Sequence, residues 1–178
     1  MTTRALPPID DHDHVDGPND APVTLVEYAD FECPFCVSAF PEIESARERY
    51  RGRVRFVFRH VPRSARDGFA KQAAEAAEAA AAQGKFWPMH RELFLHPGEH
   101  DVGRLLAHAR HIGLDVPRFE RELASRTYAP RVQELAVRAL RHGVVGVPTL
   151  FIAGERLLAP PTAEALSAAI QAALVATA

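Results

Sequence analysis

The two cysteines of the chain, Cys33 and Cys36, are the residues best suited to covalent chemistry, and they stand three positions apart. A Cys-x-x-Cys pair can close a reversible disulfide, or it can supply half of the ligands of a structural zinc site. The zinc interpretation needs histidines at a companion spacing. His108 and His111 lie three apart on a predicted helix, but many solvated pairs share that spacing, so the sequence favours redox chemistry.

The elements around the pair place it at a strand-to-helix turn. Residues 23–30 are apolar and β-branched and predict a strand, residues 34–50 predict a helix, and the alternating residues 53–59 predict a second strand. Cys33 then caps the helix, where free N–H groups and the helix dipole favour a thiolate. Cys36 follows almost one turn later and faces inward. We therefore expect Cys33 to be the nucleophile and Cys36 the resolving thiol.

Glu27 is the one acidic residue in the interior of the first predicted strand, which ends at Asp30, and its neighbours on the same face are apolar. In a sheet covered on both faces, Glu27 is buried beneath the start of the helix. A buried carboxyl with a raised pKa can relay the proton of Cys36. If the strand instead lies at the edge of the sheet, Glu27 faces solvent and has no such role.

Pro148 stands directly before the third predicted strand, at residues 149–153. It cannot donate a hydrogen bond to the sheet, so it opens the strand or forms a bend. A cis Val147–Pro148 bond would present the backbone of Val147 to a substrate chain beside Cys33, as an added strand. Because cis is the minority form of X–Pro bonds, the residues alone leave cis and trans open.

The segment between the second and third predicted strands is helical throughout. Ser64 opens an alanine-rich helix that ends near Gly84. Four further helices are predicted, at 86–96, 102–112, 115–123 and 132–140. After the third strand, a turn at residues 154–155 leads into a short strand at 156–158, and Thr162 precedes the last helix. The element order is therefore β-α-β, a helical block, then β-β-α.

Three parts of the sequence resemble the thioredoxin-fold proteins of the DsbA-like type: Glu27, Asp-Phe-Glu-Cys-Pro-Phe-Cys at 30–36, and Gly-Val-Pro-Thr at 146–149. The helical block, with Ile-Gly-Leu-Asp at 112–115, points to the same branch. The resemblance covers roughly residues 20–175. It implies an α/β, thioredoxin-like fold (β-α-β … β-β-α) with an all-helical insertion between the second and third strands.

This resemblance also assigns parts of the chain and roles within them. The expected divisions are an N-terminal tail, taken to be flexible, at 1–20, a thioredoxin-like domain at 21–62 and 143–178, and the helical insertion at 63–142. It implies a cis Pro148 packed against the active-site disulfide, a buried acid at Glu27, and Pro41 inside the first helix. The expected catalytic residues are Cys33, Cys36, Pro148 and Glu27. The expected substrate-binding rim is Val147, Phe35, Phe31 and Pro34, while Phe40 is expected to pack in the core.

The function so predicted is disulfide exchange with protein substrates that carry disulfides or thiols, with a separate redox partner. Phe35 replaces the His that the oxidase DsbA has at this position, which implies a less oxidising disulfide. No metal or bound cofactor is expected, and glutathione is a candidate reductant. The alternatives are a glutathione-dependent transferase or isomerase of the same fold, which Cys36 disfavours, and a non-redox peptide-binding module.

The overall composition is that of an ordinary globular protein, with 178 residues, 47% apolar and 25% charged. A net charge of −2 gives no reason to expect nucleic acid or a membrane surface as a partner. The Asp-His-Asp-His run at 11–14 is interpreted as solvated tail rather than a metal tract. Without a signal peptide or an apolar span, a cytoplasmic location is expected, or an extracytoplasmic one for a fragment of a longer exported protein.

Overall fold

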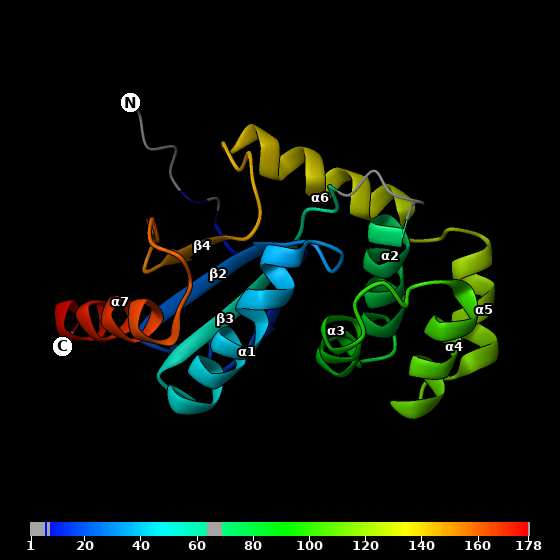
Figure 1. Cartoon of the computed structure of the whole chain (residues 1–178), viewed down its shortest axis with the longest axis horizontal. Helices are drawn as coiled ribbons and strands as arrows, with labels where there is room; N and C mark the ends of the chain where they lie inside the picture. Colours follow the sequence, from blue (N-terminus) through cyan, green and yellow to red (C-terminus); the bar gives the residue numbers. More distant parts are fainter. Residues whose placement is uncertain (1–5, 7, 64–68, 178) are drawn as a thin grey trace.

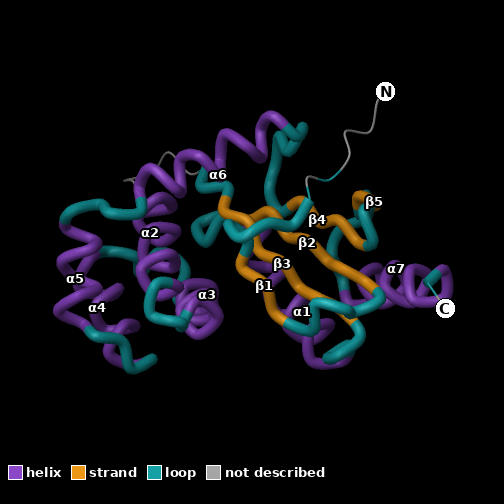
Figure 2. Tube along the Cα trace, turned by 180° about the vertical axis from the view of Figure 1, so that it is seen from behind, coloured by secondary structure: helices purple, strands orange, loops and turns teal. Residues whose placement is uncertain are grey.

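A computed structural model describes residues 6, 8–63 and 69–177, and it contains a mixed sheet with the strand order β1-β3-β2-β4-β5 (Figure 2). Its strands are β1 (His14–Asp16), β2 (Val23–Ala29), β3 (Val54–His60), β4 (Thr149–Ile152) and β5 (Glu155–Arg156). Strand β2 pairs parallel with β3 and antiparallel with β4. It is therefore a central strand, with a neighbour on each side.

Helices cover both faces of this sheet. α1 (Pro34–Arg49) and α7 (Ala163–Ala176) pack together on the face that carries Val23 and Leu25. α6 (Ala129–Arg141) covers the opposite face, where its Ala139 packs against Val26 and Tyr28. This is the thioredoxin-like α/β arrangement that the sequence predicts, and side chains that alternate along β2 are buried on either face.

The predicted helical insertion lies between β3 and β4, beside the sheet (Figure 1). Its helices before α6 are α2 (Phe69–Ala81), α3 (Phe86–Leu95), α4 (Val102–His111) and α5 (Val116–Ala124). Most of α2 is buried, because its alanines let neighbouring helices approach closely. Asp101 and Asp115 cap α4 and α5 by accepting hydrogen bonds from backbone N–H groups of the first turn. The expected helix start at Ser64 lies outside the described residues.

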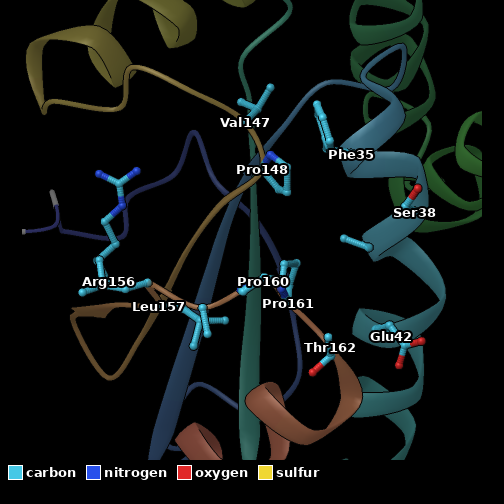
Figure 3. A pocket seen from close by; sticks show the side chains of 13 residues that line it. Phe35, Ser38, Glu42, Val147, Pro148, Arg156, Leu157, Pro160, Pro161 and Thr162 are labelled. Carbon is cyan, nitrogen blue, oxygen red and sulfur yellow. The ribbon is translucent and has the colours of Figure 1, made fainter.

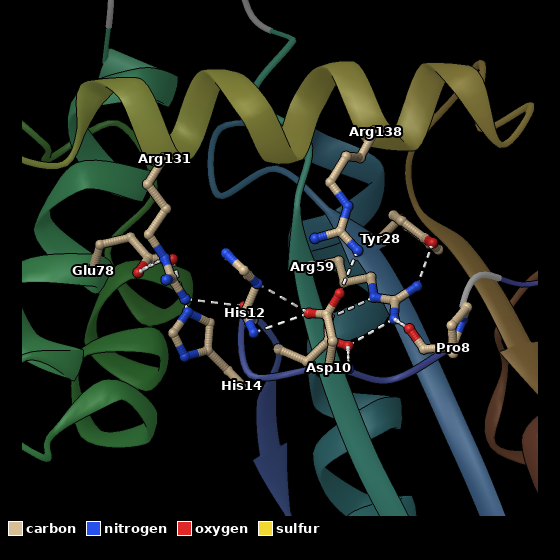
Figure 4. A network of polar contacts seen from close by, with 10 residues as sticks. Pro8, Asp10, His12, His14, Tyr28, Arg59, Glu78, Arg131 and Arg138 are labelled. Atoms are coloured by element: carbon tan, nitrogen blue, oxygen red, sulfur yellow. Dashed lines mark hydrogen bonds and ion pairs between the residues drawn. The ribbon is translucent and has the colours of Figure 1, made fainter.

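The structure differs from the expectation of a flexible tail over residues 1–20, because residues 14–16 form strand β1 against β3. The segment before β1 is held by buried charges (Figure 4). Arg59 on β3 donates hydrogen bonds of 2.6 and 2.7 Å to the Asp13 carboxylate and of 2.7 Å to the Tyr28 hydroxyl. Residues 1–5 and 7 lie outside the described part of the chain.

Two further contacts join β1 and the segment before it to the insertion. His14 Nε2 lies 2.8 Å from Glu78 Oε1, and Arg138 on α6 donates a 2.5 Å hydrogen bond to Asp10 (Figure 4). Three residues are too few for an alternating pattern, and polar side chains conceal the burial, so the sequence gives no sign of β1.

The last hairpin turns one residue earlier than the sequence predicts. Ala153 and Gly154 both have positive φ, 50° and 85°, as the two central residues of a tight hairpin turn require. Strand β5 therefore covers Glu155–Arg156, and the residues that follow are released to form the segment between β5 and α7.

Candidate active site

The cysteine pair occupies the start of α1. Cys33 is its N-cap residue, in extended conformation at φ −79° and ψ 119°, and Pro34 begins the helix. The backbone N–H of Cys33 donates to the carbonyl of Asp30 over 3.1 Å, so the turn after β2 fixes the position of Cys33. Both cysteines are free; Cys33 is half-buried and Cys36 is buried completely. The two thiols therefore have the unequal access that attack and resolution require.

The loop before β4 lies against Cys33. The Val147–Pro148 peptide bond is cis, as the family resemblance implies. The Cys33 thiol donates a 3.6 Å hydrogen bond to the carbonyl oxygen of Val147. Thr149 fixes the other side of this loop by donating a 2.8 Å hydrogen bond to the Gly146 carbonyl. Residues 114 positions apart in the chain are thus brought into contact at the reactive sulfur.

Glu27 is buried in the centre of the sheet, between Phe58 of β3 and Leu150 of β4. This position excludes the alternative of an exposed edge strand. Burial raises the pKa of Glu27 to about 8, although the charge of Arg47 acts in the opposite direction. A carboxyl with that pKa exchanges its proton near neutral pH, as a general acid or base must.

Burial, Glu27 and Cys33 all affect the pKa of the Cys36 thiol. Burial is the main cause that raises the pKa of the Cys36 thiol far above its ordinary value, and the charge of Glu27 and a hydrogen bond with Cys33 act in the same direction. Glu27 therefore lies within electrostatic reach of Cys36. A thiol held neutral in this way needs a proton acceptor before it can attack.

An apolar groove runs from the cysteine motif along α1. Its volume is about 620 Å³, and it is lined by the first turns of α1, by Val147 and Pro148, and by residues 156–162 (Figure 3). Phe35 lies across from the Val147 loop and is 75% exposed, and Pro34 is exposed as well. Phe35 and Val147 therefore line this groove, whereas Pro34 is exposed beside it without lining it, and a substrate-binding role for the three stays a prediction.

Residues 156–162, from the end of β5 to the residue before α7, line one side of this groove and were not predicted to do so from the sequence. Leu157 lines the groove, and Leu158 beside it is 89% exposed. The available signal was an apolar Leu-Leu and Pro-Pro run between a very short strand and a helix. In the structure Leu157 packs partly against the core, whereas Leu158 is too exposed for packing to explain it.

The expected place of Phe31 on the substrate-binding rim is wrong, because the structure buries this residue. Its side chain is only 1% exposed and stacks on Phe58 with ring centroids 5.4 Å apart. Phe94 of the insertion lies 4.8 Å away on another side. Phe31 therefore joins the sheet to the insertion beneath the active site. Phe40 packs in the same cluster, as expected, with its ring 4.9 Å from that of Phe94.

Two residues contact the turn that precedes the motif and were not predicted to do so, Asp30 within the turn and His100 in the insertion. The Asp30 carboxylate accepts hydrogen bonds from the backbone N–H groups of Glu32, at 2.9 Å, and Arg63, at 2.7 Å. An Asp at the end of a strand is a usual turn-forming residue, so this contact had a sequence signal. The second residue is His100, whose Nδ1 contacts the Glu32 carboxylate and which is fully buried. Nothing in its sequence context marks it.

Comparison with known proteins connects this site with one family. The sequence profile of a family described as Thioredoxin matches residues 10–172. A curated relative, the Na(+)/H(+) antiporter NhaA 3 of Salinispora tropica, is 47% identical over 167 residues, which are 93% of this chain and 26% of that protein. The chain thus spans about a quarter of the length of that relative. No helix among the described residues is long and apolar enough to cross a membrane.

Solved structures share the fold. Oxidised BdbD from Bacillus subtilis matches with a TM-score of 0.82 and 23% identity, over 92% of this chain and 94% of that one. A thioredoxin-like oxidoreductase from Silicibacter pomeroyi matches with a TM-score of 0.79 and 27% identity, over 92% and 93%. The thiol-disulfide exchange protein alpha-DsbA2 from Wolbachia pipientis matches with 0.76 and 20%, over 89% and 85%.

A further match is a periplasmic thioredoxin-like protein from Salmonella enterica serovar Typhimurium, with a TM-score of 0.74 and 20% identity, over 93% and 92% of the two chains. All four matches cover most of both chains, so they include the helical insertion as well as the sheet. The DsbA-like resemblance inferred from the sequence is confirmed.

Proposed function

Because the chain belongs to the thioredoxin family, we propose that its Cys33–Cys36 pair exchanges disulfides with polypeptide substrates. The observation that carries this proposal is the unequal placement of the two thiols. Cys33 is accessible at the N-terminus of α1 and next to Val147, whereas Cys36 is fully buried behind it. A nucleophile that meets substrate and a partner that only resolves need this difference in access.

In the reducing direction, the Cys33 thiolate attacks one sulfur of a substrate disulfide. The substrate S–S bond breaks, and its second sulfur leaves as a thiolate that takes up a proton. Cys36 then attacks the Cys33 sulfur of the mixed disulfide and releases the first substrate sulfur. The substrate gains two electrons, and the chain is left with a Cys33–Cys36 disulfide. A thiol such as glutathione then reduces the Cys33–Cys36 disulfide and returns the enzyme to its dithiol form. Oxidation of a substrate dithiol is the same sequence in reverse, and it leaves the enzyme as the dithiol, so a disulfide oxidant such as glutathione disulfide must re-form the Cys33–Cys36 bond.

Glu27 holds the proton of Cys36 during resolution. Burial keeps the pKa of the Cys36 thiol high, so attack on the mixed disulfide requires transfer of that proton to a nearby base. Glu27 is the buried carboxyl within electrostatic reach, and its pKa of about 8 allows it to accept the proton and give it back. Substitution Glu27→Gln should therefore slow resolution, with little effect on the first attack by Cys33.

The substrate we propose is an unfolded or extended polypeptide segment rather than a small thiol. The apolar groove begins at Phe35, between the two cysteines in the sequence, and continues past Val147 to Leu158. A chain joined to Cys33 in a mixed disulfide lies at the mouth of this groove. Its apolar side chains can bury the exposed ring of Phe35, which would otherwise face water.

Single-residue variants of the motif test the proposal, with insulin as the substrate and glutathione as the reductant. Cys36→Ala should lose multiple turnover and accumulate the mixed disulfide between Cys33 and insulin, detected by mass spectrometry. Cys33→Ala should form no mixed disulfide. Ser45→Ala is the matched control, because it removes one polar atom from an exposed position of the same helix and should retain full turnover.

The same experiment separates the alternatives. If Cys36→Ala keeps full turnover, resolution by Cys36 is wrong and a glutathione-dependent transferase or isomerase is favoured. If the wild-type chain binds insulin but neither reduces nor oxidises it, the groove belongs to a non-redox binding module. The direction of exchange follows from the reduction potential against glutathione, which we expect to be less oxidising than that of DsbA because Phe35 replaces a His.

For the location we propose the extracytoplasmic alternative in place of the cytoplasmic expectation. The similar protein from Salmonella is periplasmic, and oxidising compartments are where protein disulfides form and persist. In intact cells that express the chain from its own gene, a membrane-impermeant maleimide, added after a membrane-impermeant reductant has opened any Cys33–Cys36 disulfide, should then label Cys33. Labelling that appears only after lysis would place the chain in the cytoplasm instead.

A further inference from the structure

Away from the cysteine pair, three histidines surround the carboxylate of Glu92 on α3. His108 Nδ1 lies 3.1 Å from its Oε2 atom, and His111 Nδ1 lies 3.1 Å from its Oε1 atom. His96 Nδ1 lies 3.8 Å from Oε2. Glu92, His96 and His108 each offer a ligand atom to a common point, since these atoms lie within 4.8 Å of one another. We call these four residues the Glu92 cluster.

The cluster is built by two facing helices. Glu92 and His96 are four residues apart at the end of α3, and His108 and His111 are three apart at the end of α4. At these spacings the side chains of each pair project from the same side of their helix. The cluster has a buried side, where the side chain of His108 is 8% exposed, and an open side, where that of His111 is 73% exposed. An ion from solvent therefore has access to it.

No Lys or Arg in the described ranges forms an ion pair with Glu92, so its charge is available to a cation. A second group of possible metal ligands consists of His14, His60 and Glu78, but its carboxylate is already paired with an arginine. There Arg131 Nε lies 2.6 Å from Glu78 Oε2 and supplies the positive charge that an ion would supply. We therefore exclude that group as a metal site.

The geometry points to a binding site for a divalent first-row transition-metal ion at the Glu92 cluster, with Glu92, His96 and His108 as ligands and His111 on the open side. Imidazole and carboxylate groups are the ligands that Zn²⁺ and its neighbours prefer. Bonds of about 2.0–2.1 Å in a tetrahedral site separate neighbouring ligand atoms by about 3.3 Å. The observed separation between Glu92 Oε2 and His108 Nδ1, 3.1 Å, lies close to that value. His96 Nδ1 lies 2.9 Å from the backbone carbonyl oxygen of Glu92, so His96 would bind the ion through Nε2 or after Nδ1 leaves that carbonyl.

Zn²⁺ binding to the oxidised chain tests this site directly. With the Cys33–Cys36 disulfide closed, the cysteines are no longer available as thiolate ligands. Calorimetric titration with Zn²⁺ should give one ion per chain. Co²⁺ should give the d–d bands of a tetrahedral site without the charge-transfer band that thiolate ligands produce.

Three variants decide which residues hold the ion. Glu92→Gln and His96→Ala should each weaken Zn²⁺ binding by about 100-fold or more, since loss of even an outer partner costs about 10–100-fold. His142→Ala is the matched control, because this histidine stands at the end of α6, outside the cluster. It should bind Zn²⁺ as the wild type does.

A second readout does not depend on the titration. Excess Zn²⁺ should raise the melting temperature of the oxidised wild-type chain but not that of His96→Ala. The half-exposed position of His96 makes this variant the one best able to fold, and Glu92→Gln keeps the shape of the side chain. Three results would overturn the proposal: no saturable binding by the oxidised wild type, undiminished binding by both cluster variants, or an equal loss in His142→Ala.

Discussion

The buried imidazole of His100 contacts the carboxylate of Glu32, the residue that directly precedes Cys33. The other ring nitrogen of His100 lies 3.1 Å from the Leu93 carbonyl oxygen at the end of α3. A single side chain of the insertion therefore connects the end of α3 with the turn that carries the nucleophile. In this way the insertion contacts the turn that precedes Cys33 as well as adding to the core.

We expect Glu32→Gln to make the cysteine couple more oxidising. Glu32 directly precedes Cys33 in the chain, and like charges repel, so replacing the carboxylate with a neutral amide should favour the reduced form of the couple. A tenfold change in the exchange equilibrium corresponds to about 30 mV, and we expect a shift of this order. Equilibration with glutathione buffers measures it. Glu48→Gln, in an exposed position near the end of α1, is the control, and an unchanged or more negative potential for Glu32→Gln would contradict this reasoning.

The parts of the site that follow from local rules could be predicted from the sequence. Pro34 at the first position of a helix, with Cys33 before it, fixes the N-cap by short-range geometry alone. Burial of Glu27 needed one further assumption, that its strand lies inside the sheet. The order of the strands supplies that condition, because β3 and β4 flank β2.

The residues that the sequence could not place depend on contacts between distant segments. Phe31 is an aromatic residue in a turn beside an active-site motif, which suggests exposure, yet Phe94 of the insertion covers it. His100 is fully buried and contacts Glu32, which stands 68 positions earlier in the chain. No local periodicity records such a contact, so neither position could be inferred from neighbouring residues.

Phe35→Ser should lower the rate of reaction with a polypeptide disulfide by several-fold, while the reaction with glutathione disulfide changes less. The ring is 75% exposed and forms the start of the apolar groove, so a long substrate loses more contact than a small one. Stability should change little, because substitutions at exposed positions usually alter it by less than about 0.5 kcal/mol. Stopped-flow rates with insulin and with glutathione disulfide provide the comparison.

Val175→Ser is the control for this prediction, since Val175 is 79% exposed on α7 and lies outside the groove. It should leave both rates unchanged. Equal slowing of the two substrates by Phe35→Ser would show that the ring affects the reactivity of Cys33 rather than the binding of a polypeptide.

Asp13→Ala should destabilise the fold by about 3 kcal/mol, as expected when one partner of a buried ion pair is removed. The carboxylate of Asp13 accepts two hydrogen bonds from Arg59, whose side chain is only 6% exposed, and the charge of Arg59 then loses that compensation. Urea unfolding at neutral pH measures the loss. Asp11→Ala, in the same segment but exposed, should cost much less; equal losses would show that the segment as a whole, rather than the ion pair, is responsible.

Glu27 should make the stability of the chain depend on pH in the direction opposite to that of most carboxylates. In the unfolded chain Glu27 ionises around its ordinary pKa of 4.5, whereas in the folded chain burial raises the pKa to about 8. Between these values the folded state binds more protons than the unfolded state. The free energy of unfolding therefore falls as the pH rises from about 4.5 to 8, by up to about 5 kcal/mol from this one group.

Substitution Glu27→Gln removes this proton and should flatten the decline. Urea unfolding at about pH 5, 6.5 and 8, which spans the window from 4.5 to about 8, measures the free energy of unfolding of wild type and variant. The stability of Glu27→Gln relative to the wild type should increase with each step to higher pH. Glu164→Gln, an exposed change in the first turn of α7, should leave the wild-type profile unaltered. Parallel profiles for wild type and Glu27→Gln would mean that Glu27 ionises in the folded chain at its ordinary pKa, and the carboxyl could then not serve as the proton acceptor for Cys36 in the way proposed.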